Sequence, residues 1–130
     1  MSVSGTFKSG DTFRPSNRNV DIHLWIILSD PLLDPDHVLI VSMTTYKSYK
    51  DSACLLQIGE HRAVTCETCI AYEHAKITTI DRLRQAGDQE LLRPDVPVTQ
   101  DILKRIRDGS AVSRKMAIEH FELLVKQGLV

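Results

Sequence analysis

The fold of this chain is decided by residues 22–46, whose sequence is IHLWIIL (22–28), SDPLLDPD (29–36) and HVLIVSMTTY (37–46). The first and last of these segments are rich in β-branched, aromatic and other large apolar residues, a composition typical of buried strands. The segment between them contains two Asp-Pro or Pro-Asp turn signals, and the residue before a proline is disfavoured in a helix. The stretch therefore predicts two buried strands joined by a turn-rich connection.

More strands are expected on the C-terminal side of this pair. Residues 53–58 are apolar, residues 63–65 are long enough only for a short edge strand, and residues 69–77 alternate between two faces. On the N-terminal side, residues 11–20 are mostly polar and predict a loop. Closely spaced strands separated by turn signals are typical of a small barrel or sandwich.

The pattern changes to helices in the last third of the chain. Thr79 can cap a short turn of helix, and the charged, proline-containing segment 87–97 is expected to be mostly loop. Two helices are predicted at 99–108 and 113–127. Each begins at a hydroxyl residue that can cap it and is followed by a glycine that can end it.

These elements predict a single domain that is mainly β with C-terminal helices, in the α+β class. A chain of 130 residues lies within the usual size of one domain. The expected parts are a flexible start (1–10), a barrel (11–92) and a helical C-terminal part (98–128).

Composition restricts the classes of function. Sixteen Lys and Arg against 17 Asp and Glu give a net charge of −1, so bulk attraction to nucleic acid is not expected, although a local basic groove is compatible with it. No apolar run approaches the roughly 20 residues that a membrane helix needs. The polar start of the chain shows no signal peptide, and we therefore expect a cytoplasmic protein without a membrane partner.

Several sequence motifs for cofactors and metals are weak or absent. The chain has no G-x-x-x-x-G-K-[ST] or G-x-G-x-x-G loop and no G-x-S-x-G elbow. Cys66 and Cys69 form a single C-x-x-C pair, with Cys54 and His61 nearby, which is a weak zinc signal because the second pair of ligands is missing. We expect reduced thiols, no bound metal and no cofactor, with a zinc-stabilised module as a distant alternative.

Histidines are the best candidates for chemistry. His23 begins a predicted strand, His61 lies in a turn and His74 lies on the alternating strand. For any one of them alone, a ring held by backbone partners is the more common role. Together they can supply an acid and a base, because imidazole titrates close to neutral pH.

Hydroxyl, acidic and basic residues complete the candidate site. Thr44 and Thr45 close a strand, where hydroxyl groups can hold a phosphate oxygen, and Glu73 can orient a histidine or act as a base. A basic groove for RNA is expected to include Lys47, Lys50 and Arg62.

Several segments occur in the order seen in the MazF/PemK family of toxin ribonucleases, which the chain resembles over about residues 10–107. The resemblance rests on GDTF (10–13), HLWIILS (23–29), VLIVSMTT (38–45), AYEH (71–74) and the stretch 91–107. The first of these is similar to the family's opening strand, and the last is similar to its closing strand and helix. It implies an SH3-like barrel with attached helices, usually a homodimer. It also implies cleavage of single-stranded RNA without metal, by attack of the 2′-hydroxyl on the adjacent phosphate, and inhibition by an antitoxin protein.

The resemblance implies roles for individual residues. Thr44 matches the functional threonine, Glu73 the acidic position, and His23 occupies the position of the family's catalytic arginine. The RNA-binding residues would be Thr45, Lys47, His61, Arg62 and His74. Histidine is an acid or base but a weaker phosphate clamp than arginine. Two hypotheses stay open: a divergent ribonuclease that uses His23, and an inactive barrel that binds protein or RNA.

Overall fold

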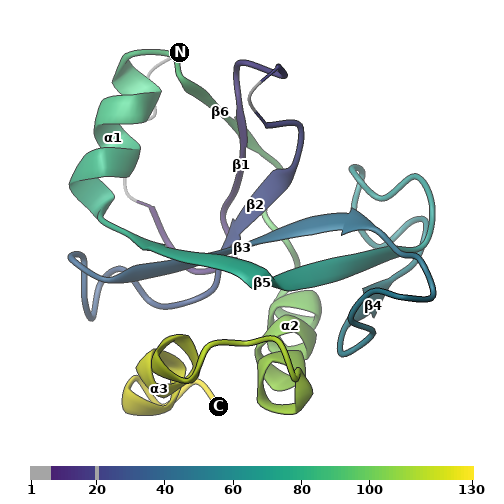
Figure 1. Cartoon of the computed structure of the whole chain (residues 1–130). Coiled ribbons are helices and arrows are strands. Elements are labelled where there is room, and N and C mark those ends of the chain that lie inside the picture. Colours follow the sequence, from purple (N-terminus) through teal and green to yellow (C-terminus); the bar gives the residue numbers. More distant parts are fainter. Residues whose placement is uncertain (1–6, 20) are drawn as a thin grey trace.

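The computed structural model describes residues 7–19 and 21–130, which form a six-stranded sheet and three helices (Figure 1). The expected flexible start falls in part on residues 1–6, which lie outside the described residues. The strands are β1 (Thr12–Pro15), β2 (Leu24–Ile27), β3 (Val38–Thr45), β4 (Leu55–Leu56), β5 (Thr68–Thr78) and β6 (Leu92–Asp95). The helices are α1 (Ile80–Asp88), α2 (Gln100–Val112) and α3 (Ile118–Lys126). Within the described ranges, no helix is long and apolar enough to cross a bilayer.

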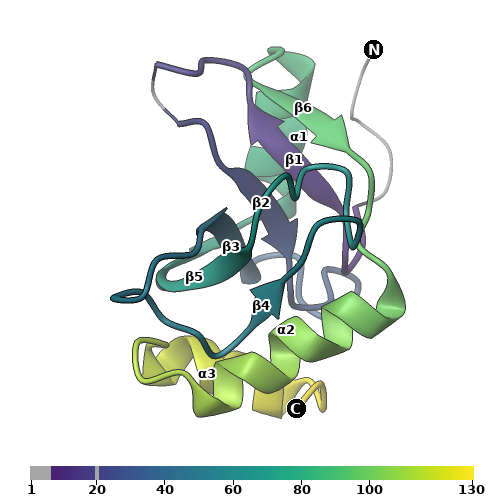
Figure 2. The same cartoon turned by 90° about the vertical axis from the view of Figure 1, so that its right-hand side faces the viewer.

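The sheet is antiparallel, with the strand order β4-β5-β3-β2-β1-β6. This confirms the prediction of a mainly β chain with C-terminal helices. The hydrogen-bonded ladder is open, because β4 and β6 are its two edges. Figure 2 shows that the connection between β4 and β5 crosses the space between these edges.

β2 and β3 are buried on both faces, which explains their nearly continuous apolar sequences. Successive side chains of a strand point to opposite faces, and the two cores follow this alternation. One core contains Leu24, Ile26, Leu39, Val41 and Met43, packed with Ile102, Leu103, Ile106 and Leu124 of α2 and α3. The other contains Trp25, Ile27, Val38 and Ile40, packed with Phe13 of β1 and Ile80 and Leu83 of α1. The central hairpin is therefore enclosed between helices.

The two open edges of the sheet are joined by side chains that converge on the segment after β6. The carbonyl oxygen of Val96 accepts hydrogen bonds from the hydroxyl of Thr12 and from Nε2 of His61, each at 2.7 Å. The other ring nitrogen of His61, Nδ1, accepts a bond from the N–H of Ala63 at 3.0 Å. Thr12 and His61 are both buried. These bonds fasten the β4–β5 connection to β1 and β6.

An ionic group reinforces this junction. The carboxylate of Asp95 accepts hydrogen bonds from Nε of Arg62 at 2.7 Å, Nε of Arg14 at 3.3 Å and the N–H of Val96 at 2.7 Å. Only 6% of the Asp95 side chain is exposed, whereas the side chains of Arg14 and Arg62 are 34% and 69% exposed, so solvent partly screens these contacts. We call Thr12, Arg14, His61, Arg62, Asp95 and Val96 the edge clamp.

Both strands at the β6 edge differ from the prediction made from local composition. β1 lies in the segment 11–20 and β6 in the segment 87–97, which that composition predicted to be mostly loop, although the family resemblance implied a strand in each. Their composition is polar and each contains a proline, so the local pattern is weak. Four residue pairs between β1 and β6 supply the stabilisation that the local sequence lacks.

Short elements near β4 also differ from prediction. The strand expected at 53–58 is limited to Leu55–Leu56, because residues 57–60 form a turn in which the N–H of Gln57 donates to the Glu60 carboxylate at 2.7 Å. The edge strand expected at 63–65 is absent, since the N–H of Val64 closes a turn on His61. Residues 9 and 10, expected to be mobile, are held by hydrogen bonds to the 27–29 segment.

Two of the three predicted helix caps are confirmed. The hydroxyls of Thr79 and Thr99 accept N–H bonds in the first turns of α1 and α2. Ser113 does not cap the last helix: it is the C-terminal cap of α2, and its hydroxyl donates to Asp51 and accepts the N–H of Lys115 in the turn before α3. α3 consequently begins later, after Ala117.

Gly109 does not end α2, although it was predicted to. The helix continues to Val112, and Gly109 is buried where α2 crosses the β4 and β5 region. A side chain at this position would collide with the hydroxyl of Tyr72 and would lie 3.0 Å from Cβ of Cys54. The glycine therefore permits a close approach of helix and sheet, and the Tyr72 hydroxyl donates to the carbonyl of Ile106 at 2.7 Å.

We predict that Gly109→Ala lowers the free energy of unfolding by about 1–3 kcal/mol, as overpacked substitutions do. Urea unfolding of the parent protein and of Gly109→Ala measures this difference in free energy. In a Tyr72→Phe background the colliding hydroxyl is gone, so the added cost of Gly109→Ala should be smaller. An equal cost in both backgrounds would contradict the close-approach explanation.

Candidate functional site

A small cavity lies beside the edge clamp and is lined by Arg14 of that clamp. Its volume is about 170 Å³, and it is partly open to solvent. Its walls come from the end of β1, the start of β2, the end of β3 and the connection between β4 and β5. The lining residues are Arg14, Ile22, His23, Leu24, Met43, Thr44, Thr45, Ala63, Thr65, Cys66 and Thr68. We call it the His23 cavity.

His23 is positioned in this cavity by Asp21. One carboxylate oxygen of Asp21 accepts bonds from the backbone N–H and from ring Nδ1 of His23, both at 2.8 Å, and the other accepts the indole N–H of Trp25 at 2.8 Å. With Nδ1–H donating to Asp21, the Nε2 atom of His23 is the basic nitrogen. The His23 side chain is 43% exposed, so this nitrogen is accessible from solvent.

The electrostatics of Asp21 keep it ionised. Burial by itself would raise the pKa of Asp21, but the hydrogen bonds from the His23 backbone, the Trp25 indole and the His23 ring together hold this pKa below its ordinary value of 3.8. A carboxylate in this position orients the imidazole. Asp21 and His23 therefore form an acid–base pair at the cavity wall.

Arg14 places a guanidinium in the same cavity. Its Nε donates to Asp95 and its Nη1 donates to the carbonyl of Ile22 at 3.4 Å, while a third of the side chain remains exposed. Arginine presents several donors in a planar fork that matches phosphate and carboxylate geometry. Arg14 is thus a fixed positive group beside His23.

Two hydroxyl groups and an ammonium lie at the end of β3. Thr44 and Thr45 both line the cavity, and Nζ of Lys50 donates to the Thr45 carbonyl at 2.8 Å and to the Thr44 hydroxyl at 3.4 Å. The antiparallel register pairs Leu24 with Met43, which brings the start of β2 next to the end of β3. The structure therefore brings His23, Thr44 and Thr45 together, as the sequence analysis expected.

Other expected site residues lie outside the cavity. Glu73 lies on an exposed part of β5 and pairs with Lys115, with Nζ and Oε2 3.8 Å apart. His74 is exposed next to it, and Lys47 is exposed in the β3–β4 connection. Glu73 is not the carboxylate that orients His23; Asp21 holds that place.

His61 and Arg62 belong to the edge clamp. Both ring nitrogens of His61 are used by backbone groups, one on Val96 and one on Ala63. The guanidinium Nε of Arg62 donates to Asp95, although most of that side chain is exposed. His61 and Arg62 do not line the His23 cavity, but their contacts hold the segment that carries Ala63, which does.

Sequence reasoning missed Asp21 and Arg14. Asp21, His23 and Trp25 alternate along an extended segment, and alternate residues of such a segment lie on one side. That D-x-H-x-W spacing was the signal for the acid–base pair. No sequence pattern around Arg14 indicated a place in the site, because its position depends on the pairing of β1 with β2 and β6.

The three cysteines do not gather into a metal site. Cys54 and Cys69 are buried, and Cys66 lies at the cavity with its sulfur 3.6 Å from the hydroxyl of Thr45. Burial raises the pKa of the Cys54 thiol to about 11, so it stays protonated at neutral pH. Over residues 7–19 and 21–130, no group of three or more His, Cys, Asp or Glu side chains is arranged to hold a metal ion.

A scan against models of known protein families finds no match to this chain, and a search of curated proteins finds none either.

We predict that Asp95→Asn lowers the free energy of unfolding by about 1–3 kcal/mol at pH 7, because it weakens charge-assisted bonds of the edge clamp. Burial alone would raise the pKa of Asp95, but bonds from Arg62, Val96 and Arg14 hold it below the ordinary 3.8. A depressed pKa stabilises the folded state above the unfolded-state pKa, and this contribution is lost as pH falls through the folded-state value.

Urea unfolding from pH 7 to pH 2 measures this. The difference between the parent and Asp95→Asn should shrink below about pH 4. Asp36→Asn is the matched control, since this carboxylate is exposed and should contribute little at any pH. A difference for Asp95→Asn that is independent of pH would contradict an ionic clamp.

Proposed function

We propose that the chain is a metal-independent endoribonuclease that cleaves single-stranded RNA in the His23 cavity. The observation that carries this proposal is the convergence of an Asp21–His23 pair, the guanidinium of Arg14 and the hydroxyls of Thr44 and Thr45 on one small, solvent-accessible cavity. An oriented base together with donors for a phosphate is the set that phosphodiester cleavage by a neighbouring hydroxyl needs.

Each group has a role in the proposed reaction. Nε2 of His23 takes the proton from the ribose 2′-hydroxyl, and the 2′-oxygen forms a bond to the adjacent phosphorus. The bond from phosphorus to the 5′-oxygen breaks, and that oxygen takes a proton from water, while protonated His23 returns its proton to the hydroxide that is left. The products are a 2′,3′-cyclic phosphate and a 5′-hydroxyl. Asp21 orients His23 and stabilises the imidazolium, as the carboxylate does in other oriented His–Asp pairs.

Arg14 and the threonines hold the phosphate in this proposal. Arg14 donates to the non-bridging oxygens, where negative charge increases in the transition state, and Thr44 adds a hydroxyl donor. In the family that the chain resembles, an arginine occupies the position of His23. Here Arg14, from the neighbouring strand β1, would supply the guanidinium while His23 supplies the base.

The proposal extends to the fold closure, the biological role and the partners of the chain. The MazF/PemK-like order of segments and the mainly β fold support an SH3-like barrel in which the edge clamp, rather than a backbone ladder, completes the closure. On that basis the chain would be the toxin of a toxin–antitoxin pair, acting in the cytoplasm as a homodimer, with an antitoxin protein blocking the cavity.

We predict that the parent protein cleaves a mixed single-stranded RNA in EDTA and that His23→Ala lowers the rate about 10²- to 10⁴-fold, the usual contribution of a general base. Thr44→Ala should also lower the rate, because it removes a phosphate donor. Gel analysis of end-labelled RNA measures both effects. His37→Ala is the matched control, since His37 also contacts an aspartate, Asp34, but lies outside the cavity.

Cleavage that requires a divalent metal, or that is unchanged in His23→Ala, would contradict the proposal. A folded parent that binds RNA without cleaving it would favour the second hypothesis, a non-catalytic binding module. Circular dichroism of every variant shows whether a loss of activity reflects a loss of folding.

A further inference from the structure

A second hollow, which is lined by several charged side chains, is linked to the His23 cavity through Lys50. Its volume is about 410 Å³. It is formed by the β3–β4 connection and by the end of α2 with the turn that follows. The lining residues are Tyr49, Lys50, Asp51, Ser52, Ala53, Val112, Arg114 and Lys115. We call it the Tyr49 groove.

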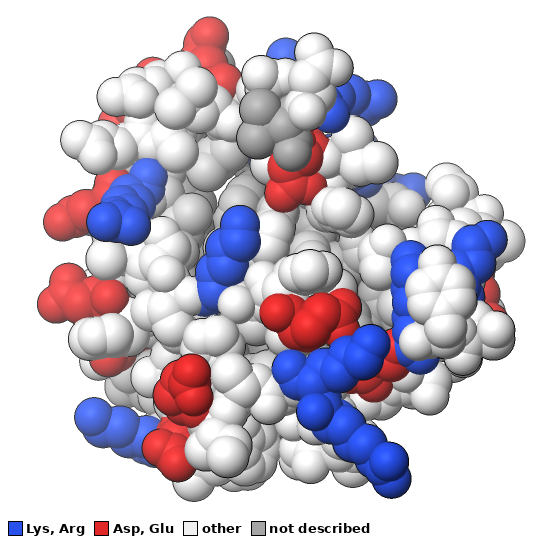
Figure 3. Space-filling model, in the orientation of Figure 1, with Lys and Arg blue, Asp and Glu red and all other residues white. Residues whose placement is uncertain are grey.

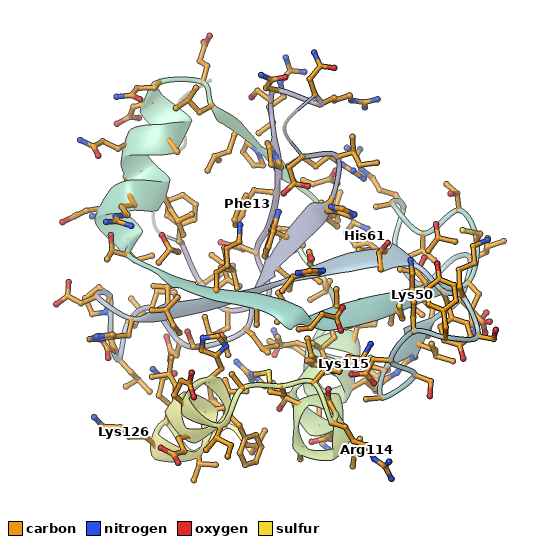
Figure 4. The ribbon with its side chains drawn as sticks, viewed as in Figure 1. Phe13, Lys50, His61, Arg114, Lys115 and Lys126 are labelled. Carbon is orange, nitrogen blue, oxygen red and sulfur yellow. The ribbon has the colours of Figure 1, made fainter. Side chains whose placement is uncertain are left out.

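Positive charge predominates around this groove. Lys50, Arg114 and Lys115 line it, and Lys47 lies on the same connection, where its carbonyl accepts the N–H of Lys50 at 2.8 Å. Figure 4 shows Lys50, Arg114 and Lys115 on the same side of the molecule, and Figure 3 shows basic side chains gathered there with acidic ones among them. The concentration is local, because the net charge of the chain is −1.

The acidic residues near the groove are already engaged. Both carboxylate oxygens of Asp51 accept bonds, one from the N–H of Ala53 at 2.9 Å and one from the hydroxyl of Ser113. Glu73 pairs with Lys115 at 3.8 Å. Among the described residues, Lys47 and Arg114 form no salt bridge, so their charge is available to an anionic ligand.

Tyr49 adds an aromatic surface to this basic groove. Its side chain is 78% exposed, although a tyrosine ring usually buries much of its apolar area. Exposed aromatic rings among lysines and arginines are the recurring elements of sites for single-stranded nucleic acid, where bases stack on the ring and cations neutralise phosphates.

Lys50 connects the groove to the His23 cavity. It lines the groove, and its Nζ donates to the Thr45 carbonyl and the Thr44 hydroxyl, both at residues that line the cavity. A strand of RNA with one phosphate at His23 can therefore continue past Lys50 into the groove.

We propose that the Tyr49 groove binds the nucleotides of single-stranded RNA that flank the scissile phosphate. This inference rests on the proposed ribonuclease function and deepens it. Tyr49 stacks on one base, and Lys47, Lys50, Arg114 and Lys115 bind the phosphates next to it. The groove supplies affinity, whereas the His23 cavity supplies the chemistry.

Binding is measured by fluorescence anisotropy with a labelled 12-nucleotide 2′-O-methyl RNA, which lacks the attacking hydroxyl and stays intact. Tyr49→Ala should weaken binding roughly 5- to 150-fold, the cost of losing one stacked base. Arg114→Ala/Lys115→Ala should weaken it and reduce the slope of log K against log salt by about 1.4, at about 0.7 for each phosphate contact.

The matched control is Arg82→Ala/Lys126→Ala, which removes the same charge from α1 and from the end of α3, away from the groove. Lys126 lies at the opposite side of the molecule from Lys50 in Figure 4. This control should bind like the parent. Thermal unfolding confirms that each variant is folded.

The outcomes separate the groove from the catalytic proposal. Groove variants that bind like the parent, or a parent that does not bind the oligonucleotide, overturn the inference. Tight binding that depends on the groove, with no cleavage of ordinary RNA, supports the groove and contradicts the ribonuclease. Cleavage with no effect of the groove variants supports the ribonuclease alone.

Discussion

The carbonyl oxygen of Val96 is the point on which this architecture depends. It accepts one bond from Thr12 on β1 and one from His61 in the β4–β5 connection, so a single acceptor joins the two ends of an open sheet. Buried polar groups that lose their partners cost about 1–3 kcal/mol each, so the three groups are strongly coupled. Together with the bond from Arg62 to Asp95, this junction holds the connection that carries Ala63, Thr65 and Cys66, which forms one wall of the His23 cavity.

The edge clamp and the His23 cavity each contain an aspartate whose pKa is lowered by hydrogen bonds. Asp95 accepts hydrogen bonds from two arginines, and Asp21 accepts them from His23 and Trp25. In both cases these bonds lower the pKa of the carboxyl by more than burial raises it, so both groups are ionised. Arg14 belongs to both groups, since Asp95 fixes its guanidinium while the remainder of the side chain lines the cavity. The structural clamp thereby orients a side chain that we assign to phosphate binding.

The central hairpin could be predicted from the sequence because its two strands are apolar enough to be buried on both faces. That prediction also brought His23 near Thr44, since an antiparallel hairpin places the start of one strand beside the end of the other. β1 and β6 could not be predicted from composition, because their stability comes from pairing between segments about 80 residues apart. Gly109 was taken for a helix end because a close approach to Tyr72 leaves no local signal.

The central claim is that the cavity directs the 2′-hydroxyl of RNA onto its own phosphate. The most direct test is the chemistry of the ends left by the full-length chain, determined by mass spectrometry of the products of a defined single-stranded RNA in EDTA. The account predicts 2′,3′-cyclic phosphate and 5′-hydroxyl ends. Products with 3′-hydroxyl and 5′-phosphate ends would contradict it, because those ends require attack by water rather than by the ribose.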